Sequence, residues 1–109
     1  MPLPKQISKF VSNVEEWQTK YFAAQTLDER LAAAQGIRLW LHGVYREVDL
    51  HGLNQPPGQR GKHREVLEHL EKVIVGLDRS IQIIRDQHVQ PPDTFRVDCE
   101  KLRNDLRVI

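Results

Sequence analysis

The chain has 109 residues, of which 39% are hydrophobic and 28% are charged. This length and composition predict a single globular domain over residues 1–109, with a core of its own and without extended disorder. Sixteen basic residues against fifteen acidic ones give a net charge of +1, which excludes a basic field over the whole molecule of the kind that attracts nucleic acid or anionic membranes.

Neither the cysteine content nor the apolar stretches indicate a secreted or membrane protein. Cys99 is the single cysteine, which excludes an intramolecular disulfide and fits a reducing compartment. The first ten residues lack the pattern of a secretory signal. The longest uncharged apolar stretches, 31–37 and 39–45, reach seven residues, whereas roughly twenty are needed to cross a bilayer. We expect a soluble, cytoplasmic protein without membrane contact.

The first predicted helix covers residues 4–24. Its apolar residues recur in steps of three and four, which is the spacing of one helix face; they include Ile7, Phe10, Val14, Trp17 and Tyr21. Pro4 suits the first turn, where its missing N–H costs nothing. Thr26 is predicted to cap the next helix, with Glu29 completing a capping box.

The second predicted helix runs from Leu27 to residue 50 or 51 and is apolar on two sides. One side carries a core stripe of Ile37, Leu41, Val44 and Val48. An interior glycine costs about 1 kcal/mol relative to alanine, so two glycines one heptad apart on the other side suggest that another backbone comes close there. We expect a close-packed seam, either inside the bundle or between two copies of the chain, formed by Ala32, Gly36, Leu39, Trp40, Gly43 and Leu50.

Two further helices follow. The third is predicted from residue 61 or 62 to Gln87, with its apolar stripe at Val66, Leu70, Val73, Leu77 and Ile84. After Pro91 and Pro92, Asp93 or Thr94 is predicted to cap a short fourth helix that carries Phe95, Cys99, Leu102 and Leu106. The pattern predicts an all-α fold: a compact four-helix bundle whose two long central helices are joined by a Pro/Gly-rich basic turn.

That turn holds the clearest candidate for a ligand contact. A basic cluster of Arg60, Lys62, His63 and Arg64 leads into the third helix, and no acidic residue occurs between Asp49 and Glu65. Flanking glycines could let backbone N–H groups face a ligand, and a helix start favours anions. The cluster is therefore either an anion, phosphate or acidic-partner site or a solvated turn.

Two arginine–histidine pairs suggest an alternative, catalytic function. Arg64 and His69, and likewise Arg46 and His51, have an Arg-x4-His spacing that resembles the motif of HEPN ribonucleases. The resemblance implies a helical dimer in which the arginine stabilises phosphate charge and the histidine moves the proton of the 2′-hydroxyl, without a metal. In both pairs a glutamate follows the arginine, where that family usually has asparagine or aspartate.

A metal site is the weaker interpretation of the histidines. Glu47 and His51, and Glu65 and His69, are each one helical turn apart, and zinc accepts such ligands. Di-metal carboxylate bundles, however, use a Glu-x-x-His spacing that is missing here. We therefore expect no metal and no cofactor. The favoured function is that of a non-enzymatic, regulatory or adaptor-like protein that forms a homodimer and binds another protein, with nucleic acid as a less favoured partner.

Overall fold

The computed structural model describes residues 6–92 and 95–109. Within these residues the chain forms no strand and four α-helices, joined in the middle by a short 3-10 helix. These elements are α1 (Gln6–Ala23), α2 (Leu27–Leu53), η1 (Pro57–Gln59), α3 (Gly61–Gln87) and α4 (Cys99–Arg107). The predicted all-α helical bundle is confirmed.

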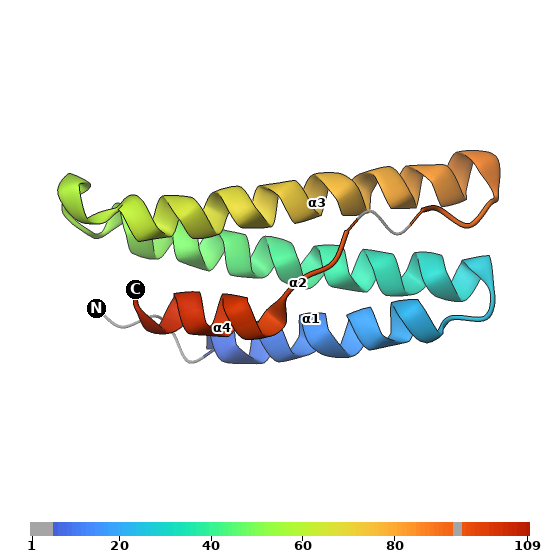
Figure 1. The fold of residues 1–109 in the computed structure, drawn as a ribbon, viewed down its shortest axis with the longest axis horizontal. Helices are drawn as coiled ribbons and strands as arrows, with labels where there is room; N and C mark the ends of the chain where they lie inside the picture. Colours follow the sequence, from blue (N-terminus) through green and yellow to red (C-terminus); the bar gives the residue numbers. More distant parts are fainter. Residues whose placement is uncertain (1–5, 93–94) are drawn as a thin grey trace.

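The three long helices, α1, α2 and α3, run along the longest axis of a molecule that measures 46 × 21 × 18 Å, each antiparallel to the one before it, and this axis is horizontal in Figure 1. α2 packs against both α1 and α3, and α4 packs against the same two helices. The described residues just before α4 cross in front of α2 in Figure 1, and α4 lies alongside α1. α4 and the described residues before it therefore cover one side of the bundle, and none of the described helices covers the opposite side of α2.

The start of α2 follows the predicted cap. The N–H of Glu29 donates to Oγ1 of Thr26 at 3.1 Å, which satisfies one of the amides that a helix leaves open at its first turn. The Glu29 carboxylate accepts from the N–H of Gln25 at 3.0 Å, one residue further back than in a standard capping box. α2 then continues to Leu53, beyond the predicted end at residue 50 or 51.

The start of α4 differs from the prediction. The predicted caps, Asp93 and Thr94, lie outside the described residues, as does Pro4. α4 begins later, at Cys99, because the carboxylate of Asp98 accepts from the N–H of Lys101 at 3.0 Å and so caps the helix there.

Phe95 therefore belongs to the connection before α4, and its predicted place in that helix was wrong. The physical reason is an anchor to α1: the N–H of Val97 donates to Oε1 of Gln18 at 2.9 Å, and Nε2 of Gln18 donates to the carbonyl of Val97 at 3.1 Å. These two bonds hold the connection in a non-helical conformation, and Phe95 is buried in the core all the same.

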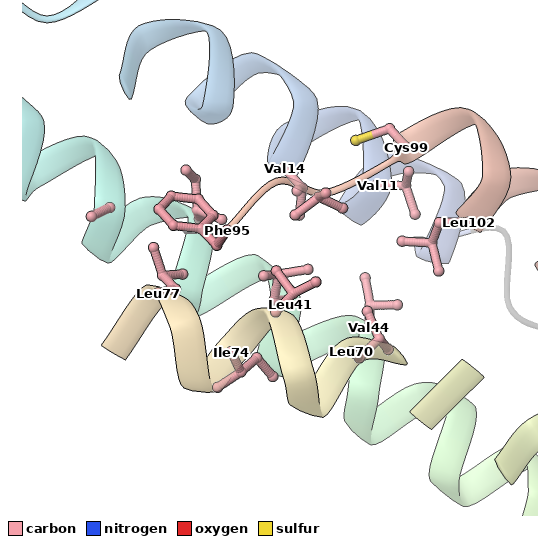
Figure 2. Packing of buried hydrophobic residues seen from close by; sticks show 14 of the residues in the cluster. Val11, Val14, Leu41, Val44, Leu70, Ile74, Leu77, Phe95, Cys99 and Leu102 are labelled. Atoms are coloured by element: carbon pink, nitrogen blue, oxygen red, sulfur yellow. The ribbon is translucent and has the colours of Figure 1, made fainter. Parts of the chain in front are cut away.

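The core lies between the helices and is closed by this connection. Figure 2 shows residues from all four helices and Phe95 converging on one cluster, among them Val11, Val14, Leu41, Val44, Leu70, Ile74, Leu77, Cys99 and Leu102. The predicted core stripe of α2 is fully buried, since Ile37, Leu41, Val44 and Val48 each have 0% exposure. Burial of such a side chain contributes about 1.5–3 kcal/mol, so this cluster dominates the stability of the fold.

Candidate functional site

Arg60, the first member of the basic cluster, binds the end of α2. Its Nε donates to the carbonyl of Gln55 at 3.0 Å, and its Nη2 donates to the carbonyl of Leu53 at 3.2 Å. The last turn of a helix leaves carbonyls without intrahelical partners, and a basic side chain is a favourable partner for them. The Arg60 guanidinium therefore stabilises the connection between α2 and α3.

Lys62 joins the start of α3 to α4. Its Nζ lies 3.1 Å from Oδ1 of Asp105 and 3.4 Å from Oε2 of Glu65. The hydrogen bond to Asp105 is the main reason that the pKa of Lys62 is raised above its ordinary value of 10.5. Arg64, by contrast, is exposed. Arg60 and Lys62 thus make contacts inside the chain, while Arg64 and part of the Lys62 side chain face solvent.

His63 points into the bundle and meets a second histidine. His63 is 5% exposed and His51, in the last turn of α2, is 7% exposed. Nε2 of His63 lies 2.8 Å from Nδ1 of His51, and the two rings are stacked with centroids 5.1 Å apart. Gly52 makes this possible, because a Cβ at that position would lie 3.2 Å from the ring of His63.

The surroundings of His63 disfavour its charged form. Burial, followed by the proximity of His51, lowers the pKa of His63 from its ordinary value of 6.5. Its Nδ1 is buried and has no hydrogen-bond partner among the residues that the structure describes. This ring is therefore neutral at neutral pH and unsuited to binding an anion.

The arginine–histidine pairs do not converge within one chain. Arg46 and Arg64 are exposed, whereas His51 is buried against His63. His69 is half-buried, and its Nε2 is buried without a partner in the described part of the chain. Five steps along an α-helix turn the side chain by about 140°, so each histidine points away from its arginine. A catalytic pair would have to be assembled from two chains.

The predicted seam on the second side of α2 forms partly inside the chain. A Cβ on Gly36 would lie 2.6 Å from Cδ2 of Trp17, and one on Gly43 would lie 3.4 Å from Cδ2 of Phe10. Trp40 packs on the same Phe10 ring, with centroids 5.3 Å apart. At both glycines the neighbouring group is an aromatic ring of α1. The sequence had instead suggested that another backbone comes close there.

The remainder of the seam faces solvent. Ala32 is exposed, and Leu39 and Leu50 are 67% and 50% exposed. Leu53, which sequence reasoning missed, is 58% exposed on the same side. Leu53 follows Leu50 by three residues, a spacing that would have placed it on the same side of the helix. It was missed because the helix was expected to end at residue 50 or 51. We call Leu39, Leu50 and Leu53 the α2 outer face.

A groove adjoins the α2 outer face. It has a volume of about 740 Å³ and is lined by residues of α2 and α3, including Arg38, Leu39, Asp78, Ile81, Gln82 and Arg85. An ion pair between Arg38 and Asp78 joins the two helices there. Exposed apolar surface that is contiguous and rimmed by polar residues marks interaction sites.

The remaining chemistry is sparse. Burial raises the pKa of the Cys99 thiol to about 11, so it is protonated and unreactive at neutral pH. Within residues 6–92 and 95–109, no group of three or more His, Cys, Asp or Glu side chains is placed to hold a metal ion. No helix in this part of the chain is both long and apolar enough to cross a membrane.

Comparison with known proteins identifies no relative: no family model, curated protein or solved structure matches the chain. The geometry of the chain itself is therefore the basis for any functional inference. Its two distinctive features are the α2 outer face and the buried histidine pair at the α2–α3 connection.

Proposed function

We propose that this chain is a non-enzymatic, regulatory or adaptor-like protein that forms a homodimer through the α2 outer face. The observation that carries the proposal is the exposure of Leu39, Leu50 and Leu53 on the side of the central helix that none of the described helices covers. Full burial of one leucine contributes about 1.5–3 kcal/mol. Covering three of them supplies a substantial driving force for association.

A second copy is the occupant that this face fits. Leu39 and Leu53 are about 21 Å apart along α2 at the helical rise per residue. If two copies cross antiparallel about a two-fold axis near Arg46, Leu39 of one copy lies level with Leu53 of the other, as an isologous interface requires. Asp49, one turn from Arg46, then offers an opposite charge close to the axis. The 46 × 21 × 18 Å molecule has long sides that can supply the roughly 800 Å² per partner of a standard interface.

The basic turn and the arginine–histidine pairs give less support to other functions. Arg60, Lys62 and His63 already contact groups of the chain itself, although the Lys62 side chain is still 39% exposed and Arg64 is exposed. A ribonuclease site would need His51 or His69 to present a ring nitrogen to RNA, and both rings have a nitrogen buried in the described structure. Protein–protein association is therefore favoured over anion binding and RNA cleavage.

The test is the molar mass of a double variant in which Leu39 and Leu50 are replaced by glutamate. Val75→Glu is the matched control, because it introduces a charge at an apolar residue of α3 that is 59% exposed. We expect light scattering on a sizing column to give a dimer for the wild type and for Val75→Glu, and a monomer for Leu39→Glu/Leu50→Glu. Circular dichroism should show the same helicity in all three. A monomeric wild type would refute the proposal.

A further inference from the structure

The histidine pair at the α2–α3 connection is built in a way that restricts where protons can reside. The 2.8 Å contact between Nδ1 of His51 and Nε2 of His63 has room for a single shared hydrogen, donated by one ring and accepted by the other. The other proton of the neutral pair can then sit on Nε2 of His51. Nδ1 of His63, which has no acceptor in the described part of the chain, stays free of a proton.

Addition of a proton to the histidine pair makes it impossible to keep Nδ1 of His63 free of a proton. A protonated pair holds three hydrogens on four ring nitrogens, and the shared contact still accepts just one of them. The other two must occupy the remaining nitrogens, so Nδ1 of His63 becomes a buried N–H without an acceptor among the described residues, whichever ring carries the charge. A buried donor without a partner is costly. A second added proton would place two N–H groups against each other across the contact.

We propose that the contact between His51 and His63 is an acid-sensitive latch, and that proton uptake by the pair releases the start of α3 from the end of α2. This inference is independent of homodimerisation. The latch is tight in its neutral state, because Gly52 leaves its side-chain space to the ring of His63.

The nearby charged groups do not offset the effect of a proton on His63. At this end of the bundle, Arg60 of the connection binds the carbonyls of Leu53 and Gln55, and Lys62 of α3 binds Asp105 of α4. Glu47 precedes His51 by one turn on α2, and Lys9 of α1 and the neighbours Arg64 and Glu65 on α3 are exposed. Burial opposes the protonation of His63, and so does a proton on His51.

The direction of the pH effect follows from the lowered pKa of His63. Below the ordinary histidine pKa of 6.5, the opened chain binds a proton that the closed chain does not, so acid favours opening. The closed latch has its full stability above about pH 6.5 and loses it as the pH falls below that value. If His63 alone takes up a proton on opening, the opening equilibrium rises by up to about tenfold between about pH 7.5 and about pH 5.5.

The test is amide hydrogen exchange of the wild-type chain at these two pH values, corrected for the intrinsic rates. We expect protection in the last turn of α2 and the first turn of α3 to fall several-fold in acid, while the middle of both helices changes little. His63→Phe, which keeps a ring but cannot titrate, should lose this local pH dependence. His42→Gln, which removes an exposed histidine from α2, should keep it.

Equal protection of the junction at both pH values would overturn the latch, as would an unchanged pH dependence in His63→Phe. If His63→Phe does not fold, the proton resonances of the His63 ring in the wild type give a second test. A titration midpoint below 6.5 supports the latch, and one at or above this value overturns it. These experiments do not measure the molar mass. The latch can therefore be refuted while the homodimer stands, and the homodimer can be refuted while the latch stands.

Discussion

Gly36 and Gly43, one heptad apart on α2, should respond in opposite directions to substitution by alanine. In a helix interior, glycine to alanine normally stabilises by about 1 kcal/mol. At Gly43 the new Cβ would lie 3.4 Å from Cδ2 of Phe10, which is ordinary contact, so Gly43→Ala should stabilise the fold by about 0.5–1 kcal/mol. At Gly36 the new Cβ would lie 2.6 and 2.8 Å from Cδ2 and Cε3 of Trp17.

Those two atoms belong to the rigid fused ring of Trp17, so the whole indole must move. Overpacking of this kind costs about 1–3 kcal/mol, which exceeds the gain in helix propensity, and we expect Gly36→Ala to destabilise by about 1 kcal/mol. Thermal unfolding measures the effect, since about 1 kcal/mol shifts the Tm of a domain this size by about 4 °C. All variants should be compared at one protein concentration, because dimerisation makes the Tm concentration-dependent.

A double-mutant cycle assigns the effect to the ring. In a Trp17→Leu background the clash is relieved, and Gly36→Ala should then be neutral or stabilising. If Gly36→Ala and Gly43→Ala raise the Tm of the wild type equally, the Trp17 ring does not rest on Gly36 and the internal packing of this side of α2 has been misassigned.

Two further predictions concern the connection to α4 and the cysteine within it. Gln18→Leu removes both hydrogen bonds to the backbone of Val97, so it should cost about 1–3 kcal/mol and speed amide exchange at Val97; an unchanged Tm would show that the anchor is dispensable. Because burial raises the pKa of Cys99 to about 11, iodoacetamide should alkylate the folded chain far more slowly than the urea-unfolded chain, and equal rates would contradict the burial of the thiol.

The local features of the fold could be predicted from the sequence because they depend on neighbouring residues. Apolar residues three and four apart identified the core stripe of α2, and Thr26 with Glu29 identified its start. The non-helical connection before α4 could not be predicted in this way. Asp98 caps α4 locally, but the chain before it is held by the bonds between Gln18 and Val97, which join positions far apart in the chain and leave no periodic signal.

The candidate site depends on how α1 is aligned against α2, and on how α3 is aligned against the end of α2. Neighbouring residues in the sequence do not determine these alignments. The two sides of α2 were recognised as apolar, but only the position of α1 decides that Trp17 and Phe10 cover the glycines while Leu39 and Leu50 stay exposed. The basic cluster was likewise visible as a run of charge. The inward orientation of His63 toward His51 depends on how the α2–α3 connection places the start of α3 against the end of α2. The composition of the connection does not reveal this orientation.

The molar mass of the wild-type chain in solution tests dimerisation through the α2 outer face most directly. Light scattering over a range of protein concentrations should give twice the monomer mass of 12.7 kDa, and the monomer mass once Leu39 and Leu50 are replaced by glutamate. A wild type that stays at the monomer mass at every concentration, or a double variant that remains a dimer, would contradict the assignment of this face as the interface.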